Sequence, residues 1–176
     1  MDLLTPYYKA QLVQKHQTSP WGGGGWIWIP EIAKLIVRHK LKKPTVLEYG
    51  SGRRTFKKTM DWAMPHVKIH EYDPGVPEID ILPVAGYQFD LVLNTDVMEH
   101  VEEQFVEQTF DRLYGHCRFA AVFNIACTPS KSTLPDGANA HVTVKPPEWW
   151  KERIARRWND IEILTAHKNL TIIATK

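Results

Sequence analysis

A short apolar segment that runs into a glycine turn constrains the fold of this chain more than any other feature. Residues 45–54 read Thr-Val-Leu-Glu-Tyr-Gly-Ser-Gly-Arg-Arg. The first half predicts a buried strand, and Gly50 and Gly52 then allow backbone angles and close approaches that a Cβ atom would forbid. A turn that opens into a helix presents free backbone N–H groups to a ligand. The segment therefore predicts a strand–turn–helix unit with a ligand-binding turn.

Strand-like and helix-like segments alternate along the rest of the chain. The predicted strands are 45–49, 67–72, 79–82, 89–93, 119–126, 161–165 and 170–174. The predicted helices are 7–13, 31–43, 56–64, 96–114 and one that begins at Pro146 or Pro147. This alternation predicts a mostly parallel sheet with helices on both faces and a ligand site beyond the carboxyl ends of its strands. The last two strands are joined by a short turn, which predicts a closing antiparallel hairpin.

The length of 176 residues predicts a single domain spanning 1–176. We divide it into an N-terminal region, 1–43, and a core, 44–176. Within the first region, residues 19–30 contain four consecutive glycines and three tryptophans. Glycine runs disfavour regular structure, so we expect a flexible loop anchored by its aromatic side chains.

The composition is that of an ordinary globular protein, with 43% hydrophobic and 24% charged residues. No apolar run approaches the roughly 20 residues that span a bilayer, and the N-terminus does not resemble a signal peptide. Cys117 and Cys127 fall in or near one predicted strand, so we expect no disulfide and a reducing, cytoplasmic setting. A net charge of +2 gives no indication of a nucleic-acid partner.

From Thr45 to Lys176 the chain resembles class I S-adenosylmethionine-dependent methyltransferases, including small phage-encoded members. The resemblance rests on segments in the family's order: 47–52 (LEYGSG), 71–74 (EYDP), Asp80, 89–101 (FDLVLNTDVMEHV) and, more loosely, 136–144. It implies a Rossmann-like three-layer α/β sandwich. The sheet is then mostly parallel and ends in an antiparallel hairpin, with a shortened segment after the second strand.

The resemblance also implies a site for S-adenosylmethionine. Its cofactor-binding residues are Glu48, Gly50, Ser51, Gly52, Asp73, Asp80, Asn94 and Asp96. In this interpretation the glycine backbone passes under the methionine part of the cofactor, and Glu48 holds its ammonium group directly or through water. Asp73 accepts hydrogen bonds from the ribose hydroxyls, as carboxylates do in dinucleotide sites. Asp80 accepts from the adenine amino group, and Asn94 and Asp96 lie beside the transferable methyl group.

Several of these residues have simpler interpretations. Asp73 precedes Pro-Gly and is also a typical turn former, and Asp96 is a candidate helix cap. Asp96, His100 and His141 are the candidate catalytic residues, although Glu99 and His100 also fit a solvated surface. The eight histidines show no metal-site spacing, so we predict no metal ion.

Two departures from the family pattern stand out. Arg54 occupies the place of a customary third glycine, where it would narrow the cofactor pocket or contact the cofactor carboxylate. The segment between the second strand and Phe89 is very short, which leaves the adenine side thinly covered. We hypothesise that the tract from Trp21 to Trp28 acts as a lid there, and that replacing Trp26 or Trp28 weakens cofactor binding.

The favoured function is methyl transfer to a small-molecule acceptor. This reaction is an in-line displacement, so the enzyme mainly positions its reactants and, for a nitrogen or oxygen acceptor, supplies a base. The sequence Asn-Thr-Asp-Val at 94–97 lacks the Pro-Pro-aromatic motif of DNA amino-methyltransferases. A noncatalytic S-adenosylmethionine-binding protein is the main alternative. A nicotinamide-dependent oxidoreductase fits less well, because Thr55 stands where its third glycine belongs.

Overall fold

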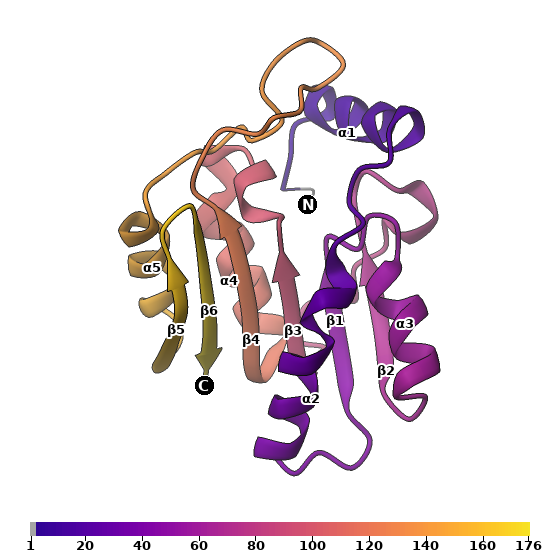
Figure 1. The fold of residues 1–176 in the computed structure, drawn as a ribbon, viewed down its shortest axis with the longest axis vertical. Coiled ribbons are helices and arrows are strands. Elements are labelled where there is room, and N and C mark those ends of the chain that lie inside the picture. Colours follow the sequence, from indigo (N-terminus) through magenta and orange to yellow (C-terminus); the bar gives the residue numbers. More distant parts are fainter. Residues whose placement is uncertain (1–2) are drawn as a thin grey trace.

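A six-stranded sheet forms the centre of the molecule (Figure 1). The computed structural model describes residues 3–176. The strand order is β2-β1-β3-β4-β6-β5, in which β2, β1, β3 and β4 are parallel and the β6–β5 hairpin is antiparallel. The strands are β1 (Thr45–Tyr49), β2 (Lys68–Tyr72), β3 (Phe89–Thr95), β4 (Cys117–Ala126), β5 (Asp160–Ala166) and β6 (Asn169–Thr175). The predicted fold class is confirmed.

Helices cover both faces of this sheet. The helices α2 (Ile29–Arg38) and α3 (Thr55–Ala63) lie on one face, and α4 (Val106–His116) and α5 (Pro147–Ala155) lie on the other (Figure 1). Side chains alternate along each strand, so Val46 packs with α2 and α3 while Leu47 packs with α4 and α5. Both residues are fully buried, which fixes the register of β1.

The helix α1 (Pro6–Thr18) lies across the carboxyl ends of the parallel strands, beneath the long loop that follows β4 (Figure 1). It begins after Thr5, whose hydroxyl accepts a hydrogen bond from the Tyr8 N–H, and Pro6 occupies the first turn. Tyr8 and Leu12 pack against Leu134 of that loop. The helix therefore closes the edge of the sheet at which a ligand site is expected.

The prediction of a strand at 79–82 is wrong. These residues form the end of a 3₁₀ helix, η2 (Pro77–Ile79), followed by irregular backbone, and β2 is the edge strand. A parallel neighbour of β2 would need a crossover of a dozen or more residues, and only residues 73–78 are available. This side of the sheet is therefore one strand shorter than predicted.

The single helix predicted at 96–114 is also wrong in its first half. Two 3₁₀ turns, η3 (Met98–His100) and η4 (Glu103–Phe105), precede α4. Asp96 has a left-handed backbone with φ 55°, and Val101 is extended, so a continuous helix is interrupted at both points. The broken segment remains at the carboxyl edge of the sheet instead of packing along its face.

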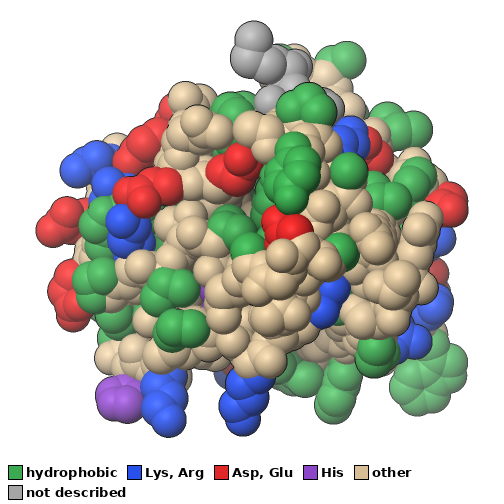
Figure 2. Space-filling model, turned by 90° about the horizontal axis from the view of Figure 1, so that it is seen from above, with side chains coloured by type: hydrophobic (Ala, Val, Ile, Leu, Met, Phe, Trp, Pro, Cys, Tyr) green, Lys and Arg blue, Asp and Glu red, His purple; other side chains and the backbone are tan. Residues whose placement is uncertain are grey.

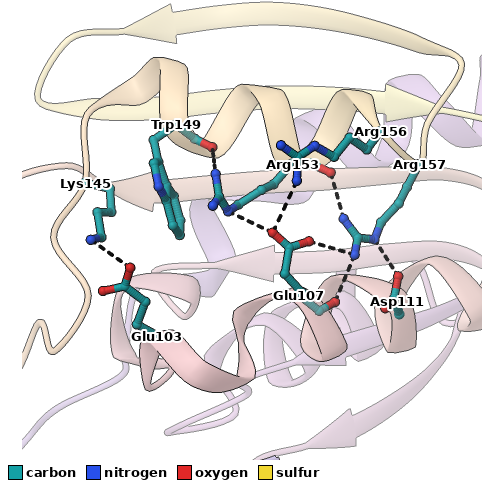
Figure 3. A network of polar contacts seen from close by, with 8 residues as sticks. All are labelled: Glu103, Glu107, Asp111, Lys145, Trp149, Arg153, Arg156 and Arg157. Carbon is teal, nitrogen blue, oxygen red and sulfur yellow. Dashed lines mark hydrogen bonds and ion pairs between the residues drawn. The ribbon is translucent and has the colours of Figure 1, made fainter.

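An ion-pair network fastens α5 to α4 on the side of the molecule nearest the hairpin (Figure 3). Glu107 accepts from Arg153 at 3.0 Å and from Arg157 at 2.9 Å, and Arg157 also contacts Asp111 at 2.7 Å. The Arg153 guanidinium stacks on Trp149 with 3.2 Å to the ring centroid. We interpret this cluster as a structural clamp between two helices, because its charges are paired with one another.

Cys117 and Cys127 are both free, as predicted, and the cytoplasmic setting inferred from them stays a prediction. Between residues 3 and 176 no helix has both the length and the apolar character required to cross a bilayer.

Candidate functional site

A cavity of about 340 Å³ lies at the carboxyl ends of β1, β2 and β3, beneath α1 and the glycine tract. Its walls include Tyr8, Leu12, His16, Trp21, Gly22–Gly25, Glu48–Gly52, Asp73, Asp96, Glu99, His100 and His141. Figure 2 views the molecule from this end, and most of the Lys and Arg side chains visible there lie toward its margins. No concentrated basic surface therefore covers this end in that view.

The glycine turn forms one end of the cavity. Gly50 and Gly52 have φ values of 92° and 46°, which favour glycine. A Cβ atom on Gly50 would lie 2.2 Å from a methyl carbon of Val97, and one on Gly52 would lie 2.5 Å from the Gly22 carbonyl oxygen. The glycine tract thus lies directly against the glycine turn, and both positions require the absence of a side chain.

The turn's N–H groups are bonded within the protein, so the prediction that they are free is wrong. The Gly50 and Ser51 N–H groups both donate to the Tyr72 carbonyl, at 2.7 and 3.1 Å. The Gly52 N–H donates to Asp73 Oδ2 at 2.8 Å. Because β1 and β2 are adjacent and parallel, the end of β2 supplies acceptors to the turn. A ligand at this end therefore finds no free N–H donor at Gly50, Ser51 or Gly52.

Asp73 and Glu48 are the carboxyl groups at this end. Asp73 accepts N–H bonds from Gly52 and Gly75, both 2.8 Å long, and His16 Nε2 lies 3.8 Å away. Burial raises the pKa of Asp73, while His16 and the two N–H donors oppose that shift. Glu48 Oε2 is buried without a hydrogen-bond partner, and burial raises the pKa of Glu48 to about 8. A buried acid of this kind favours a cationic partner.

Asp80, Asn94 and Arg54 lie away from the cavity. Asp80 pairs with Lys9 of α1 and lines a separate hollow beside Tyr72. Asn94 is fully buried, and its amide lies 3.4 Å from the Tyr49 carbonyl. The Arg54 guanidinium makes a two-point ion pair with Glu71 and does not line the cavity, so it does not narrow it. Its contact with a cofactor carboxylate stays a prediction.

Asp96 and the two predicted histidines line another part of the cavity, which we call the histidine end. Asp96 caps no α-helix; its N–H donates to the Asn124 carbonyl at 2.7 Å, and its Oδ1 accepts from the Asn124 amide at 2.6 Å. The His100 and His141 rings meet edge to face with centroids 4.9 Å apart. Burial lowers the pKa of His100 to about 3. Side chains from two segments, the one that follows β3 and the loop between β4 and α5, therefore come together here.

Glu99 is a site residue that sequence reasoning missed. Its side chain is almost fully buried, in contrast to the surface interpretation. Oε1 accepts the Ala126 N–H at 3.0 Å, whereas Oε2 is buried without a partner, and burial raises the pKa of Glu99 to about 8. No local pattern indicates this burial, because it depends on the end of β4 lying against the broken segment.

Within the glycine and tryptophan tract, Trp21 is the tryptophan that lines the cavity. Its ring contacts His16 and His100 at centroid distances of 4.8 and 4.7 Å. Trp26 is 55% exposed, and Trp28 packs against the α2–α3 core. Trp21 and the four glycines of the tract line the cavity, whereas Trp26 and Trp28 do not, and the lid role stays a hypothesis.

Comparisons with known proteins bear on this fold. No protein-family model and no curated protein matches the chain. It is similar in structure to a putative O-methyltransferase from Nostoc punctiforme, with 16% identity and a TM-score of 0.58 over 94% of this chain and 60% of that one. The chain is also similar to human N-acetylserotonin methyltransferase, whose structure was solved in complex with S-adenosylmethionine. The identity is 12% and the TM-score 0.57, over 96% of this chain and 56% of that one. The chain thus spans about 60% of the length of these proteins.

A third similar structure matches over nearly its whole length. It is Burkholderia thailandensis 1,6-didemethyltoxoflavin N1-methyltransferase with bound 1,6-didemethyltoxoflavin and S-adenosylhomocysteine. The identity is 15% and the TM-score 0.56, over 100% of this chain and 92% of that one. Likeness at such low identity carries the fold alone. The chain has the Rossmann-like fold of class I S-adenosylmethionine-dependent methyltransferases.

Proposed function

We propose that this chain transfers the methyl group of S-adenosylmethionine to a small acceptor bound in the cavity. The observation that supports the proposal is that two groups of residues with different chemistry line one cavity. The glycine turn with Glu48 and Asp73 lies at one end, and Asp96 with the two histidines lies at the other. The volume of about 340 Å³ is within the range of small-molecule sites.

The residues at the glycine turn fit this cofactor. The unpartnered Glu48 Oε2 is suited to an ammonium group, which would supply the cation that this buried acid lacks. Each Asp73 oxygen accepts one N–H bond and keeps a second lone pair for a ribose hydroxyl. The absence of side chains at Gly50 and Gly52 allows Val97 and the Gly22 carbonyl to lie directly against the turn, which brings the glycine tract to the edge of the site. We do not extend the proposal to Asp80 and Asn94, because neither lines the cavity.

The chain's part in the reaction is to orient the reactants and manage a proton. S-adenosylmethionine supplies an electrophilic methyl group. Asn124 holds Asp96 by Oδ1, and Oδ2 accepts no hydrogen bond from residues 3–176, so Asp96 is placed to take a proton from the acceptor. Tyr8, Leu12 and Trp21 give the cavity an apolar wall, which favours displacement of water when the reactants bind.

The size of the acceptor follows from the same surroundings. Residues of α1 line the cavity, and the view from this end shows no dense basic surface for a polyanion. A small acceptor fits this better than a nucleic acid, which binds largely through phosphate contacts with Lys and Arg.

Calorimetry of S-adenosylmethionine and S-adenosylhomocysteine binding tests the proposal. Wild-type protein should bind both, and Glu48→Gln should bind at least about tenfold more weakly, because it loses the charge facing the ammonium. Glu162→Gln, on the exposed strand β5, is the matched control and should bind as wild type does.

Turnover then separates the competing functions. Incubation with S-adenosylmethionine and a small-molecule extract should produce S-adenosylhomocysteine. Tight binding without turnover on any extract would favour the noncatalytic alternative. Stabilisation by NAD and not by S-adenosylmethionine would favour the oxidoreductase.

A further inference from the structure

Three side chains that commonly bind metals meet at the histidine end of the cavity. Glu99 and His100 belong to the segment that follows β3, and His141 lies on the loop between β4 and α5. One potential ligand atom from each lies within 4.8 Å of the other two. Donor atoms in a four-coordinate zinc site lie about 3.4 Å apart, so small side-chain rotations would bring this set into range.

Both histidines are held in the manner of metal ligands. The Nδ1 atoms of His100 and His141 lie 2.6 Å from the carbonyl oxygens of Ala140 and Thr128. With Nδ1–H donating to a carbonyl, Nε2 carries the free lone pair, which is the tautomer that binds a metal. A second hydrogen bond of this kind commonly fixes the orientation of metal-binding imidazoles.

Glu99 supplies an independent indication of a ligand. Its residue is 1% exposed, Oε1 accepts the Ala126 N–H, and Oε2 has no partner. Buried carboxylates are normally paired with cations or bound to metals, because an unpartnered buried charge is costly. Nothing described between residues 3 and 176 pairs with Oε2. A cation between Glu99 and the two histidines would satisfy it.

The two segments that carry these ligands are already joined. The Thr143 N–H donates to the Glu99 carbonyl at 3.0 Å, and the Thr143 hydroxyl donates to the Val101 carbonyl at 2.7 Å. These bonds and the contact between His100 and Ala140 hold the loop between β4 and α5 against the segment that follows β3. The ligand set is therefore preformed, which reduces the ordering cost of binding an ion.

We propose that Glu99, His100 and His141 bind one divalent transition-metal ion whose remaining coordination positions face the cavity. Two imidazoles with one carboxylate suit zinc, cobalt, iron or manganese, whereas calcium and magnesium prefer sites built from oxygen atoms. Three protein ligands with an open position are typical of catalytic metal sites, and four are typical of structural ones.

The role of this ion rests on the proposed function, although the binding of the ion does not. A metal ion beside Asp96 would bind an acceptor hydroxyl and lower its pKa. The hydroxyl proton then passes to Asp96, the oxygen forms a bond to the methyl carbon, and the electron pair of the broken carbon–sulfur bond remains on sulfur. The acceptor class that follows is a small molecule with a hydroxyl oxygen within reach of both the metal and the methyl group.

Cobalt titration of tag-free, chelator-treated full-length protein tests the site directly. Wild-type protein should bind one equivalent of Co²⁺ with visible ligand-field absorption, and Zn²⁺ should displace it. His141→Ala and Glu99→Gln should each lower Co²⁺ affinity by at least about tenfold. His167→Ala, which removes an exposed histidine on the β5–β6 turn, is the control and should bind as wild type does.

Folding and cofactor binding are measured on the same samples. Circular dichroism establishes whether each variant is folded. If Glu99→Gln does not fold, the test rests on His141→Ala. Glu48→Gln should lose affinity for S-adenosylmethionine and keep its Co²⁺ site, so the two proposals fail separately. Absence of Co²⁺ binding to wild type, or equal binding to folded His141→Ala, would overturn the metal site.

Discussion

The two ends of the cavity are built in different ways. At the glycine turn, the chemistry comes from residues 48–52 and from Asp73, at the ends of two adjacent parallel strands. At the histidine end, Glu99 and His100 meet His141 from a distant loop, and the contact depends on bonds made by Thr143. The first end is formed by the ends of two adjacent strands, whereas the second forms only once a distant loop packs against the segment that follows β3.

The largest expected effect comes from breaking the glycine turn. Gly50→Ala places a Cβ atom 2.2 Å from Val97 in a left-handed backbone, so we expect a loss of roughly 3 kcal/mol or more in the free energy of unfolding. Gly86 has a similar φ of 89°, but a Cβ atom added there would meet no atom within 4 Å. Gly86→Ala should therefore lower the free energy of unfolding by only about 1 kcal/mol. Urea denaturation measures both. Equal losses would mean that the contact with Val97 is unimportant.

The pH dependence of stability tests Glu48, the buried acid at the same end. Burial raises its pKa from 4.5 to about 8, so the folded state binds more protons than the unfolded state between these values. Its contribution to stability therefore falls as pH rises through this window, by up to a few kcal/mol. The free energy of unfolding of Glu48→Gln should decline less between pH 5 and 8 than that of wild type, with both measured in buffers that contain a metal chelator. Identical pH profiles would contradict the proposed burial.

A smaller effect is expected where the glycine tract bridges the two ends. Trp21→Ala removes contacts with His16 and His100 and should weaken S-adenosylhomocysteine binding by roughly five- to tenfold. Trp26→Ala, at an exposed position, should leave the affinity unchanged. Calorimetry compares the two variants. The reverse order of effects would restore our original hypothesis about the lid.

The smallest effect concerns Arg54, which has a left-handed φ of 61° at the position where the family pattern has its third glycine. Both Arg54→Gly and Arg54→Ala lose the ion pair with Glu71. Only glycine relieves the left-handed strain, so Arg54→Gly should be more stable than Arg54→Ala by roughly 1 kcal/mol. Thermal denaturation of the two variants measures this difference. A more stable alanine variant would show that the strain is negligible.

The parts of the fold predicted from sequence are those governed by local pattern. The apolar run that contains Val46 and Leu47 and the short turn before β6 were sufficient to predict β1 and the hairpin. The predicted strand at 79–82 failed because residues 73–78 are too short for a parallel crossover. The helix at 96–114 failed because Asn124, from the neighbouring strand, holds Asp96 in a left-handed conformation.

The site shows the same division between residues identified from the local sequence and residues that only the fold brings together. The glycines, Glu48 and Asp73 were identified from their order along the chain, and the structure places all of them around the cavity. Glu99 was missed, and the histidines showed no metal spacing, because their convergence follows from Thr143 and from the end of β4. Asp80 and Asn94 were assigned by resemblance to a longer sheet, and in this fold neither reaches the cavity.

A crystal structure with S-adenosylhomocysteine tests the central claim that the two ends form one active site. We predict the ribose hydroxyls on Asp73, the amino group facing Glu48 and the sulfur directed toward Asp96. S-adenosylhomocysteine bound outside this cavity, or bound with its sulfur directed away from Asp96, would show that the two ends do not form one active site.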